Sequence, residues 1–234
     1  MGSETAGVPE GLKERLKASY DAIAPVYNKW TIPHYAYRTQ YLEMALQRLN
    51  LADRSGGDPA FLELGCGCGL PATQMLLQAH PSARVVANDL SETQLALARE
   101  NLIQTPNSDD QIARRLELVQ GDMSALEFQD ASFDLVVALF SFIHLPRVEQ
   151  EALFQRVSRW LRPGGFFLAN FSRDDTESAV IEKWLDEKGW MYWSGWGQQK
   201  TLDKLREVGF EIEVAEVVDE KNAHTAFVWV IAKL

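Results

Sequence analysis

The 234-residue sequence has few cysteines, and their positions narrow what the protein can be. Cys66 and Cys68 stand two positions apart in one glycine-rich turn. Two cysteines of a single tight turn cannot link distant parts of a fold, which argues against the disulfide framework of a small secreted domain. No second Cys or His pair at ligand spacing accompanies them, so we expect no metal site.

Long apolar segments and positive charge are also scarce. The longest apolar stretch, Leu135 to Ile143, is too short to cross a bilayer. No apolar signal segment opens the chain. The net charge of −10 leaves no excess of basic residues to neutralise nucleic-acid phosphates. We therefore expect a cytoplasmic protein, a monomer or a homodimer, with neither a membrane nor a nucleic-acid partner.

The composition, with 46% hydrophobic and 24% charged residues, is typical of a globular protein. The length of the chain suits one domain. Residues 1–50 predict a helical cap of two or three short helices, interrupted at Pro25 and Pro33. Residues 51–172 predict the core of the domain. A helix and a strand hairpin follow at 201–234.

Strand and helix patterns alternate through that core, which predicts a parallel, doubly wound α/β sheet. Ser91 is expected to cap one of the helices. The expected elements are strands at Phe61–Leu64, Ala83–Asn88, Leu116–Gln120, Asp134–Phe140 and Phe166–Phe171, a helix that begins near Pro71 and carries Met75, Leu76 and Leu77, helices at Glu92–Leu102, Arg147–Leu161 and Thr201–Val208, and a hairpin of Phe210–Val218 with Ala226–Ala232.

The first strand runs directly into glycines at 65, 67 and 69. Glycine permits a positive φ and lets a ligand approach the backbone closely. A dinucleotide-binding fingerprint would need glycine or alanine at Leu70, and it is absent.

Two acidic residues follow strands at the same expected edge. Asp89 ends the second strand, about 20 residues past the glycines, where a carboxylate can accept hydrogen bonds from ribose hydroxyls. Asp122 follows the third strand in Gly121-Asp122-Met123. A helix N-terminal charge at Asp89 and a local turn at Asp122 are the plainer alternatives.

These three features, with Glu63 ahead of the G-x-G-x-G turn, resemble the cofactor motifs of class I S-adenosylmethionine-dependent methyltransferases. Tyr20 to Asn28 resembles the Y-D-x-x-A-x-x-Y-D opening of the small-molecule type active in ubiquinone and menaquinone biosynthesis, but departs from it at Asn28. The resemblance implies a Rossmann-like seven-stranded sheet of order 3-2-1-4-5-7-6, its last strand antiparallel. It also implies S-adenosyl-L-methionine as cofactor and S-adenosyl-L-homocysteine as product.

The resemblance assigns the cofactor site residue by residue. It implies that the two tyrosines of the opening motif cover the methionine end of the cofactor, although core packing explains them about equally well. The implied cofactor residues are Tyr20, Tyr27, Glu63, Gly65, Gly67, Gly69, Asp89, Leu90, Asp122, Met123, Leu139 and Phe140.

Residues 173–200 crowd aromatic side chains around glycines with neither helical nor alternating spacing, so we expect an aromatic lid over an apolar or planar substrate. A lid that only packs on its own domain is the alternative. His144 and His224 are candidate catalytic bases, although histidines in such loops often only make local hydrogen bonds. The candidate substrate residues are Tyr20, Trp30, His144, Trp190, Tyr192, Trp193, Trp196 and His224.

The resemblance, taken with the aromatic lid, implies methyl transfer to an O, N, S or C atom of a small organic metabolite. In-line displacement depends mainly on positioning, and a general base is needed only when the nucleophile must first lose a proton. The alternative is a protein of the same fold that binds the cofactor but catalyses a rearrangement or serves as a binding subunit.

Overall fold

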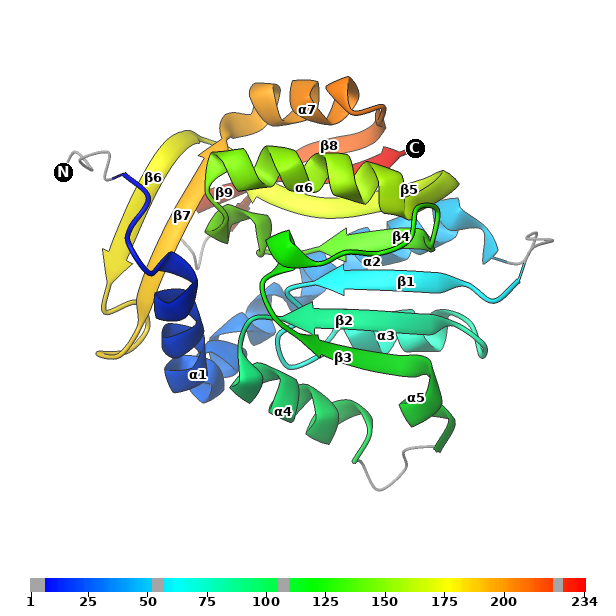
Figure 1. The fold of residues 1–234 in the computed structure, drawn as a ribbon, viewed down its shortest axis with the longest axis horizontal. Coiled ribbons are helices and arrows are strands. Elements are labelled where there is room, and N and C mark those ends of the chain that lie inside the picture. Colours follow the sequence, from blue (N-terminus) through cyan, green and yellow to red (C-terminus); the bar gives the residue numbers. More distant parts are fainter. Residues whose placement is uncertain (1–6, 52–56, 105–109, 221–224) are drawn as a thin grey trace.

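The computed structural model describes residues 7–51, 57–104, 110–220 and 225–234. A seven-stranded sheet forms the centre of the molecule and helices cover both of its faces (Figure 1). Its strand order is β3-β2-β1-β4-β5-β9-β8. The strands are β1 Ala60–Leu64, β2 Arg84–Asp89, β3 Leu116–Gln120, β4 Phe133–Ala138, β5 Leu161–Ser172, β8 Glu211–Glu220 and β9 Thr225–Lys233.

This order confirms the predicted topology. Strands β1 to β5 pair in parallel, whereas β9 is antiparallel to both β5 and β8. The predicted numbers 7 and 6 become 9 and 8 because two further strands, outside this sheet, lie between β5 and β8 in the chain. Every residue of β4 is buried, as expected of a parallel strand covered on both faces.

The core helices are α3 Ala72–Ala79, α4 Glu92–Leu102, α5 Asp110–Arg115, α6 Arg147–Trp160 and α7 Gly197–Glu207. The α4 prediction is confirmed with its cap, since the Ser91 hydroxyl accepts from the Gln94 amide at 3.1 Å. Helix α5 was not predicted. One apolar cluster joins α2 (Tyr35–Leu49), α3 and α4 to the sheet and a second joins α6 and α7, which makes three layers.

The N-terminal region forms α1 Leu12–Thr31, a 3₁₀ turn η1 Ile32–His34, and α2 Tyr35–Leu49. The predicted break at Pro25 is wrong, because Pro25 lies inside α1. Its ring is exposed, while the preceding Ile23 and Ala24 are fully buried and hold the helix on the domain. Pro33 does stand where the chain changes from one helix to the next.

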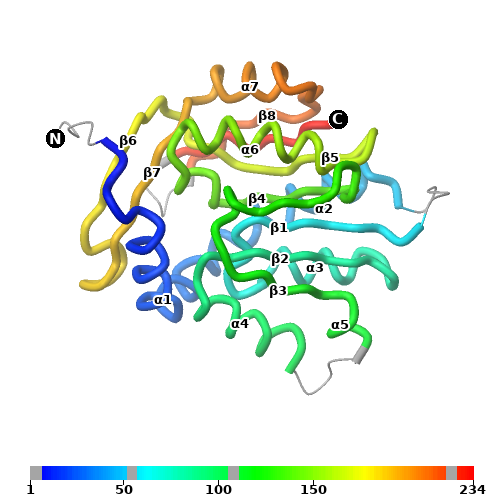
Figure 2. Tube along the Cα trace, viewed as in Figure 1, coloured from blue at the N-terminus to red at the C-terminus, as the bar shows by residue number. Residues whose placement is uncertain are grey.

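The segment expected to be an irregular aromatic lid contains two strands, β6 Asp175–Glu182 and β7 Trp190–Trp196, which pair as a separate antiparallel hairpin. The hairpin lies beside α1, at the end of the sheet where the parallel strands finish (Figures 1 and 2). The spacing of the aromatic residues did not predict a strand, because β7 is buried on both faces in its first half and its apolar residues therefore do not alternate with polar ones.

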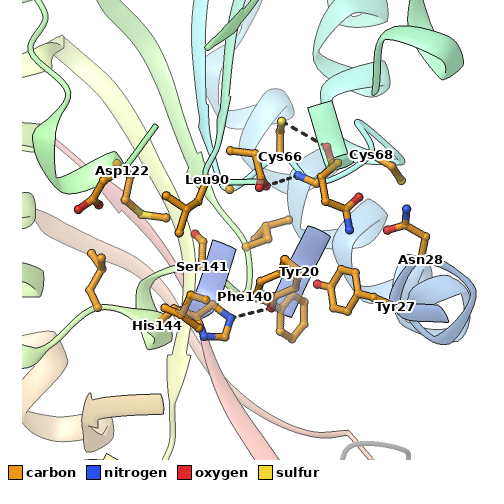
Figure 3. A pocket seen from close by; sticks show the side chains of 18 of the residues that line it. Tyr20, Tyr27, Asn28, Cys66, Cys68, Leu90, Asp122, Phe140, Ser141 and His144 are labelled. Carbon is orange, nitrogen blue, oxygen red and sulfur yellow. Dashed lines mark hydrogen bonds between the residues drawn. The ribbon is translucent and has the colours of Figure 1, made fainter. Parts of the chain in front are cut away.

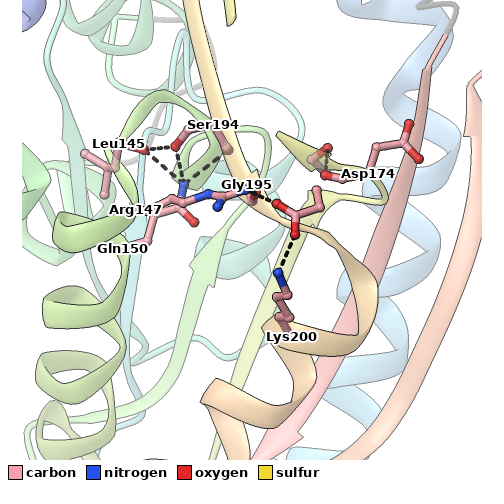
Figure 4. Close-up of polar contacts among 9 residues, drawn as sticks. Leu145, Arg147, Gln150, Asp174, Ser194, Gly195 and Lys200 are labelled. Carbon is pink, nitrogen blue, oxygen red and sulfur yellow. Dashed lines mark hydrogen bonds and ion pairs between the residues drawn. The ribbon is translucent and has the colours of Figure 1, made fainter. Parts of the chain in front are cut away.

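Polar contacts fasten β7 to α6 (Figure 4). The Gln150 amide donates to Leu145 O at 2.9 Å and to the Ser194 hydroxyl at 3.0 Å. The Arg147 guanidinium donates to Gly195 O at 3.1 Å and pairs with Asp175. The hairpin is thereby held in a fixed position beside the ends of the parallel strands.

Candidate functional site

The glycine turn after β1 adopts a conformation that side chains would disturb. Gly65, Gly67 and Gly69 have φ values of +78°, +56° and +79°. A Cβ on Gly65 would lie 2.5 Å from the Ser141 Cβ, and one on Gly69 would lie 2.6 Å from the Leu102 Cδ1. Contacts below 3 Å cannot be accommodated without a shift, so the turn packs closely only because its backbone is bare.

Asp89, at the end of β2, stabilises this turn by hydrogen bonding. One carboxylate oxygen accepts from the Gly67 amide at 2.8 Å and the other from the Ser91 amide at 2.8 Å. Burial raises the pKa of Asp89 to about 6, although both amide hydrogen bonds oppose the shift. A carboxylate has about four lone-pair sites, so Asp89 can still accept hydrogen bonds from a ligand.

A cavity of about 790 Å³ opens beside the turn, at the carboxyl ends of the parallel strands (Figure 3). Three of its polar atoms, Ser141 Oγ and the two side-chain amide atoms of Gln94, have no partner among the described residues. Its lining includes Tyr20, Tyr27, Gly65, Gly67, Asp89, Leu90, Asp122, Met123, Leu139, Phe140 and His144 among the predicted residues, together with Lys13, Asn28, Arg38, Gln94 and Ser141.

A second cavity of about 400 Å³, which we call the aromatic cavity, adjoins the first. It is lined by Tyr20, Tyr27, Trp30, His34, Arg38, Phe140, Ile143, His144, Trp184, Trp193 and Phe227. Five residues line both cavities, namely Tyr20, Tyr27, Arg38, Phe140 and His144. A ligand in one cavity therefore meets a ligand in the other along this shared wall.

Phe140 forms part of the shared wall in a strained conformation. Its φ is +58°, a region that costs an L-residue about 1–2 kcal/mol. Its amide donates to the Asn170 Oδ1 at 2.6 Å, which anchors it to the neighbouring strand β5. Strain of this kind persists only where the surroundings fix it, and it concentrates at binding sites.

Tyr20 and His144 form a hydrogen-bonded pair at the same wall. The His144 Nδ1 lies 2.9 Å from Tyr192 O, and a carbonyl only accepts, so Nδ1 carries the proton. The Nε2 is then free to accept from the Tyr20 hydroxyl, 2.9 Å away. Burial lowers the pKa of His144 to about 4 and raises that of Tyr20 well above 10, so both side chains are neutral at pH 7.

Two further sets of polar contacts tie helix α1 over the larger cavity. The Lys13 ammonium lies 3.2 Å from Asp122 and 2.6 Å from Glu149 on α6. The Asp21 carboxylate accepts from the Ser91 hydroxyl at 2.6 Å and from the Thr93 amide at 3.1 Å, at the N-terminus of α4. These contacts close the cavity on the side of α1.

The structure places several predicted residues away from both cavities. Glu63 is buried behind the turn, where it accepts from the Thr73 hydroxyl at 2.5 Å, and burial raises its pKa to about 7. Gly69 packs on α4. His224 lies outside the described residues.

Of the predicted lid residues, Trp193 lines the aromatic cavity, whereas Trp190, Tyr192 and Trp196 line neither cavity. Trp190 and Tyr192 pack in an apolar cluster with α1. Trp196 lies under the cations of Arg147 and Lys204.

The sequence analysis missed several lining residues, among them Arg38, Gln94 and Phe227, whereas Trp184 was expected as part of the aromatic lid. Arg38 and Gln94 sit within ordinary amphipathic helices, where nothing distinguishes them from surface residues. Trp184 belongs to the same aromatic-rich segment that suggested a lid, so composition alone gave a usable signal there.

Comparison with known proteins agrees with this geometry. A family model described as "Methyltransferase domain" matches residues 61–165. A phosphatidylethanolamine N-methyltransferase of Cereibacter sphaeroides is 31% identical over 167 residues, which cover 70% of this chain and 76% of that protein. A sterol 24-C-methyltransferase of Neurospora crassa is 26% identical over 186 residues, which cover 75% of this chain and 45% of that protein.

The chain spans less than half the length of the sterol methyltransferases it matches. Among solved structures, the 1,6-didemethyltoxoflavin-N1-methyltransferase of Burkholderia thailandensis superposes with a TM-score of 0.71 at 18% identity, covering 100% of this chain and 92% of that one. The [4+2]-cyclase SpnF also gives 0.71, at 16% identity, covering 99% and 98%. These two likenesses show a shared fold.

The chain belongs to the class I S-adenosylmethionine-dependent methyltransferases. The chemistry of the residues that line the larger cavity also fits S-adenosylmethionine. The bare turn at Gly65 and Gly67 gives a ligand access to backbone, and Asp89 offers a carboxylate to a ribose diol. The unpartnered atoms of Gln94 and Ser141 supply further polar sites.

Proposed function

We propose that the protein transfers a methyl group from S-adenosylmethionine to a small organic acceptor bound in the aromatic cavity. The observation that carries this proposal is the wall shared by the two cavities, where Tyr20, Arg38, Phe140 and His144 face both. Two ligands that meet at one wall can be aligned for a direct in-line displacement.

Each cavity has its own part in the proposed reaction. Asp89, Leu90, Asp122 and Met123 would hold the nucleoside, with Tyr20 over the methionine end. The bound sulfonium would supply an electrophilic methyl group at the shared wall. The aromatic side chains would orient the acceptor and exclude water, which strengthens every electrostatic interaction inside.

His144 is better suited to hold Tyr20 than to remove a proton from the acceptor. With its Nε2 occupied by the Tyr20 hydroxyl and its pKa near 4, it is a weak base at neutral pH. The proposed reaction therefore relies on positioning, and it favours acceptors that are already nucleophilic.

Relatives support a small organic acceptor without naming it. The curated relatives include methyltransferases named for sterols, phosphatidylethanolamine and demethylmenaquinone. The aromatic cavity of this chain suits a planar or apolar body of similar chemistry.

The test is production of S-adenosylhomocysteine by the purified protein over a panel of phenols, quinols, heteroaromatic amines and enols. We expect turnover with at least one planar acceptor, and loss of cofactor binding in Asp89→Ala, measured by calorimetry. A protein that ignores S-adenosylmethionine, or an Asp89→Ala variant with undiminished affinity, would contradict the proposal.

A second function belongs to the same fold. The cyclase SpnF superposes over nearly the whole chain, so a rearrangement without methyl transfer is the competing proposal. Mass spectrometry of each incubation separates the two, because a rearrangement consumes the acceptor without raising its mass by one methyl group and leaves S-adenosylmethionine intact.

A further inference from the structure

Arg38 carries the one fixed charge among the described residues that line the aromatic cavity, and none of those residues is a carboxylate. Its guanidinium carbon lies 4.8 Å from the centre of the Phe140 ring. Its Nε has no hydrogen-bond partner among the described residues. A guanidinium presents five N–H donors, so Arg38 has donors available for a ligand.

Among the described residues, Glu63 is the carboxylate whose pKa the charge of Arg38 lowers, and it does not neutralise Arg38. Burial still leaves that pKa at about 7, so Glu63 is only partly ionised at neutral pH. Glu63 instead accepts from Thr73. The other cation of the site, Lys13, is already paired with Asp122 and Glu149.

A cavity walled by aromatic rings ordinarily attracts cations, because the faces of the rings are electronegative. Arg38 reverses that preference. A bound ammonium would stand close to the guanidinium, and none of the described residues that line the cavity is a carboxylate that could offset the repulsion. A planar anion would stack on the same rings and gain a charge-assisted hydrogen bond to the guanidinium.

We propose that Arg38 selects the acceptor class, and that this class is planar ring compounds carrying an anionic oxygen, such as an ionised phenol or enol. The proposal rests on the function proposed above. It places the anionic oxygen at the shared wall, because Arg38 lines both cavities. Pairing with the guanidinium also lowers the pKa of the acceptor, so ionisation needs no protein base.

The chemistry balances without a further reagent. The acceptor loses its proton to solvent on binding or before it. When its oxygen is the acceptor atom, one oxygen–carbon bond forms to the methyl group and the methyl–sulfur bond breaks. The electron pair of that bond stays on sulfur, so an anion and a sulfonium become an ether and a thioether, both neutral at the reacting atoms.

The test uses three probes with one ring and different charges, namely 1-naphthoate, 1-naphthamide and 1-naphthylmethylammonium. Each is titrated by calorimetry into the protein saturated with S-adenosylhomocysteine. We expect naphthoate to bind at least tenfold more tightly than either other probe. The preference should vanish in Arg38→Gln and persist in part in Arg38→Lys, which keeps the charge but not the fork of donors.

Two controls keep the result specific. Lys29→Gln removes an exposed cation from the end of α1 and should leave the preference intact. The affinity of Lys29→Gln for S-adenosylhomocysteine should stay within about threefold of wild type, with an unchanged thermal midpoint, and the Arg38 variants are compared at saturating S-adenosylhomocysteine.

Tighter binding of the ammonium or of the amide would overturn the proposal. So would an Arg38→Gln variant that loses affinity for S-adenosylhomocysteine but keeps the naphthoate preference, because Arg38 would then serve the cofactor. These measurements need no turnover, so they fail independently of the test for methyl transfer.

Discussion

The Tyr20 hydroxyl lies 2.9 Å from the His144 Nε2, and the opposite ring nitrogen of His144 lies 2.9 Å from Tyr192 O. This chain of contacts joins α1, the turn after β4 and the hairpin strand β7. It fixes the tautomer of His144 and directs the proton of Tyr20 toward the histidine. The Tyr20 oxygen lies at the wall shared by the two cavities and can accept a hydrogen bond there.

Tyr20→Phe should lower kcat about tenfold or more while changing the affinity for S-adenosylhomocysteine by less than threefold, because it removes a positioned oxygen but keeps the ring. His144→Gln should be milder, since a side-chain carbonyl can also accept from Tyr20. The pH profile of kcat, measured at saturating cofactor, should show no limb near pH 6.5 that depends on His144. A limb near that pH that disappears in His144→Gln would instead identify His144 as a general base.

Binding of S-adenosylhomocysteine should strengthen as the pH rises through about 6, because the ionised form of Asp89 is the better acceptor for ribose hydroxyls. With a pKa of about 6, the ionised fraction rises about tenfold between pH 5 and pH 7, and the apparent affinity should follow it. Calorimetry of wild type and Asp89→Asn across this range measures the effect. An equally steep profile in Asp89→Asn would assign the titration to another group.

Glu63 gives a prediction about folding stability. Its pKa is raised from 4.5 to about 7 by burial, so the folded state binds this proton more tightly than the unfolded chain does. The resulting stability is fully present below pH 4.5 and is lost as the pH rises toward 7, by an amount on the order of 3 kcal/mol.

Glu63→Gln cannot ionise and should escape this loss. Urea unfolding at pH 5 and pH 8 should show the variant gaining about 2–3 kcal/mol relative to wild type at the higher pH. Comparing the two pH values cancels any constant effect of the amide on packing. A difference between variant and wild type that does not depend on pH would show that Glu63 does not titrate in this range.

The sequence predicted the sheet order and much of the cofactor cavity because those features have local signals. Gly65 and Gly67 need positive φ, and Asp89 must follow a strand end. The wrong predictions concern segments whose conformation is determined by contacts with distant parts of the chain. Pro25 stays within a helix because it lies on the exposed side of α1. The buried residues beside it, Ile23 and Ala24, hold the helix against the domain.

The aromatic cavity was harder to predict for a related reason. It is assembled from α1, η1, α2, the turn after β4, the hairpin and β9, which are far apart in sequence. Arg38 has no local signal at all, because its significance depends on the rings gathered around it. Trp190 and Trp196 share their strand with Trp193, yet only Trp193 lines the cavity.

The Lys13 ion pairs give a prediction about how helix α1 affects the rate at which S-adenosylhomocysteine is released. Lys13 bridges Asp122 and Glu149 with side chains that are 21–32% exposed, so the pairs are worth about 1 kcal/mol at most and weaken with salt. Because the helix covers the larger cavity, Lys13→Gln should speed the release of S-adenosylhomocysteine several-fold at low ionic strength, with a smaller effect at high salt. Stopped-flow tryptophan fluorescence at both salt concentrations measures release, and Lys29→Gln controls for the lost charge. Equal release rates in Lys13→Gln and wild type at low salt would show that the helix closes the site through its apolar contacts alone.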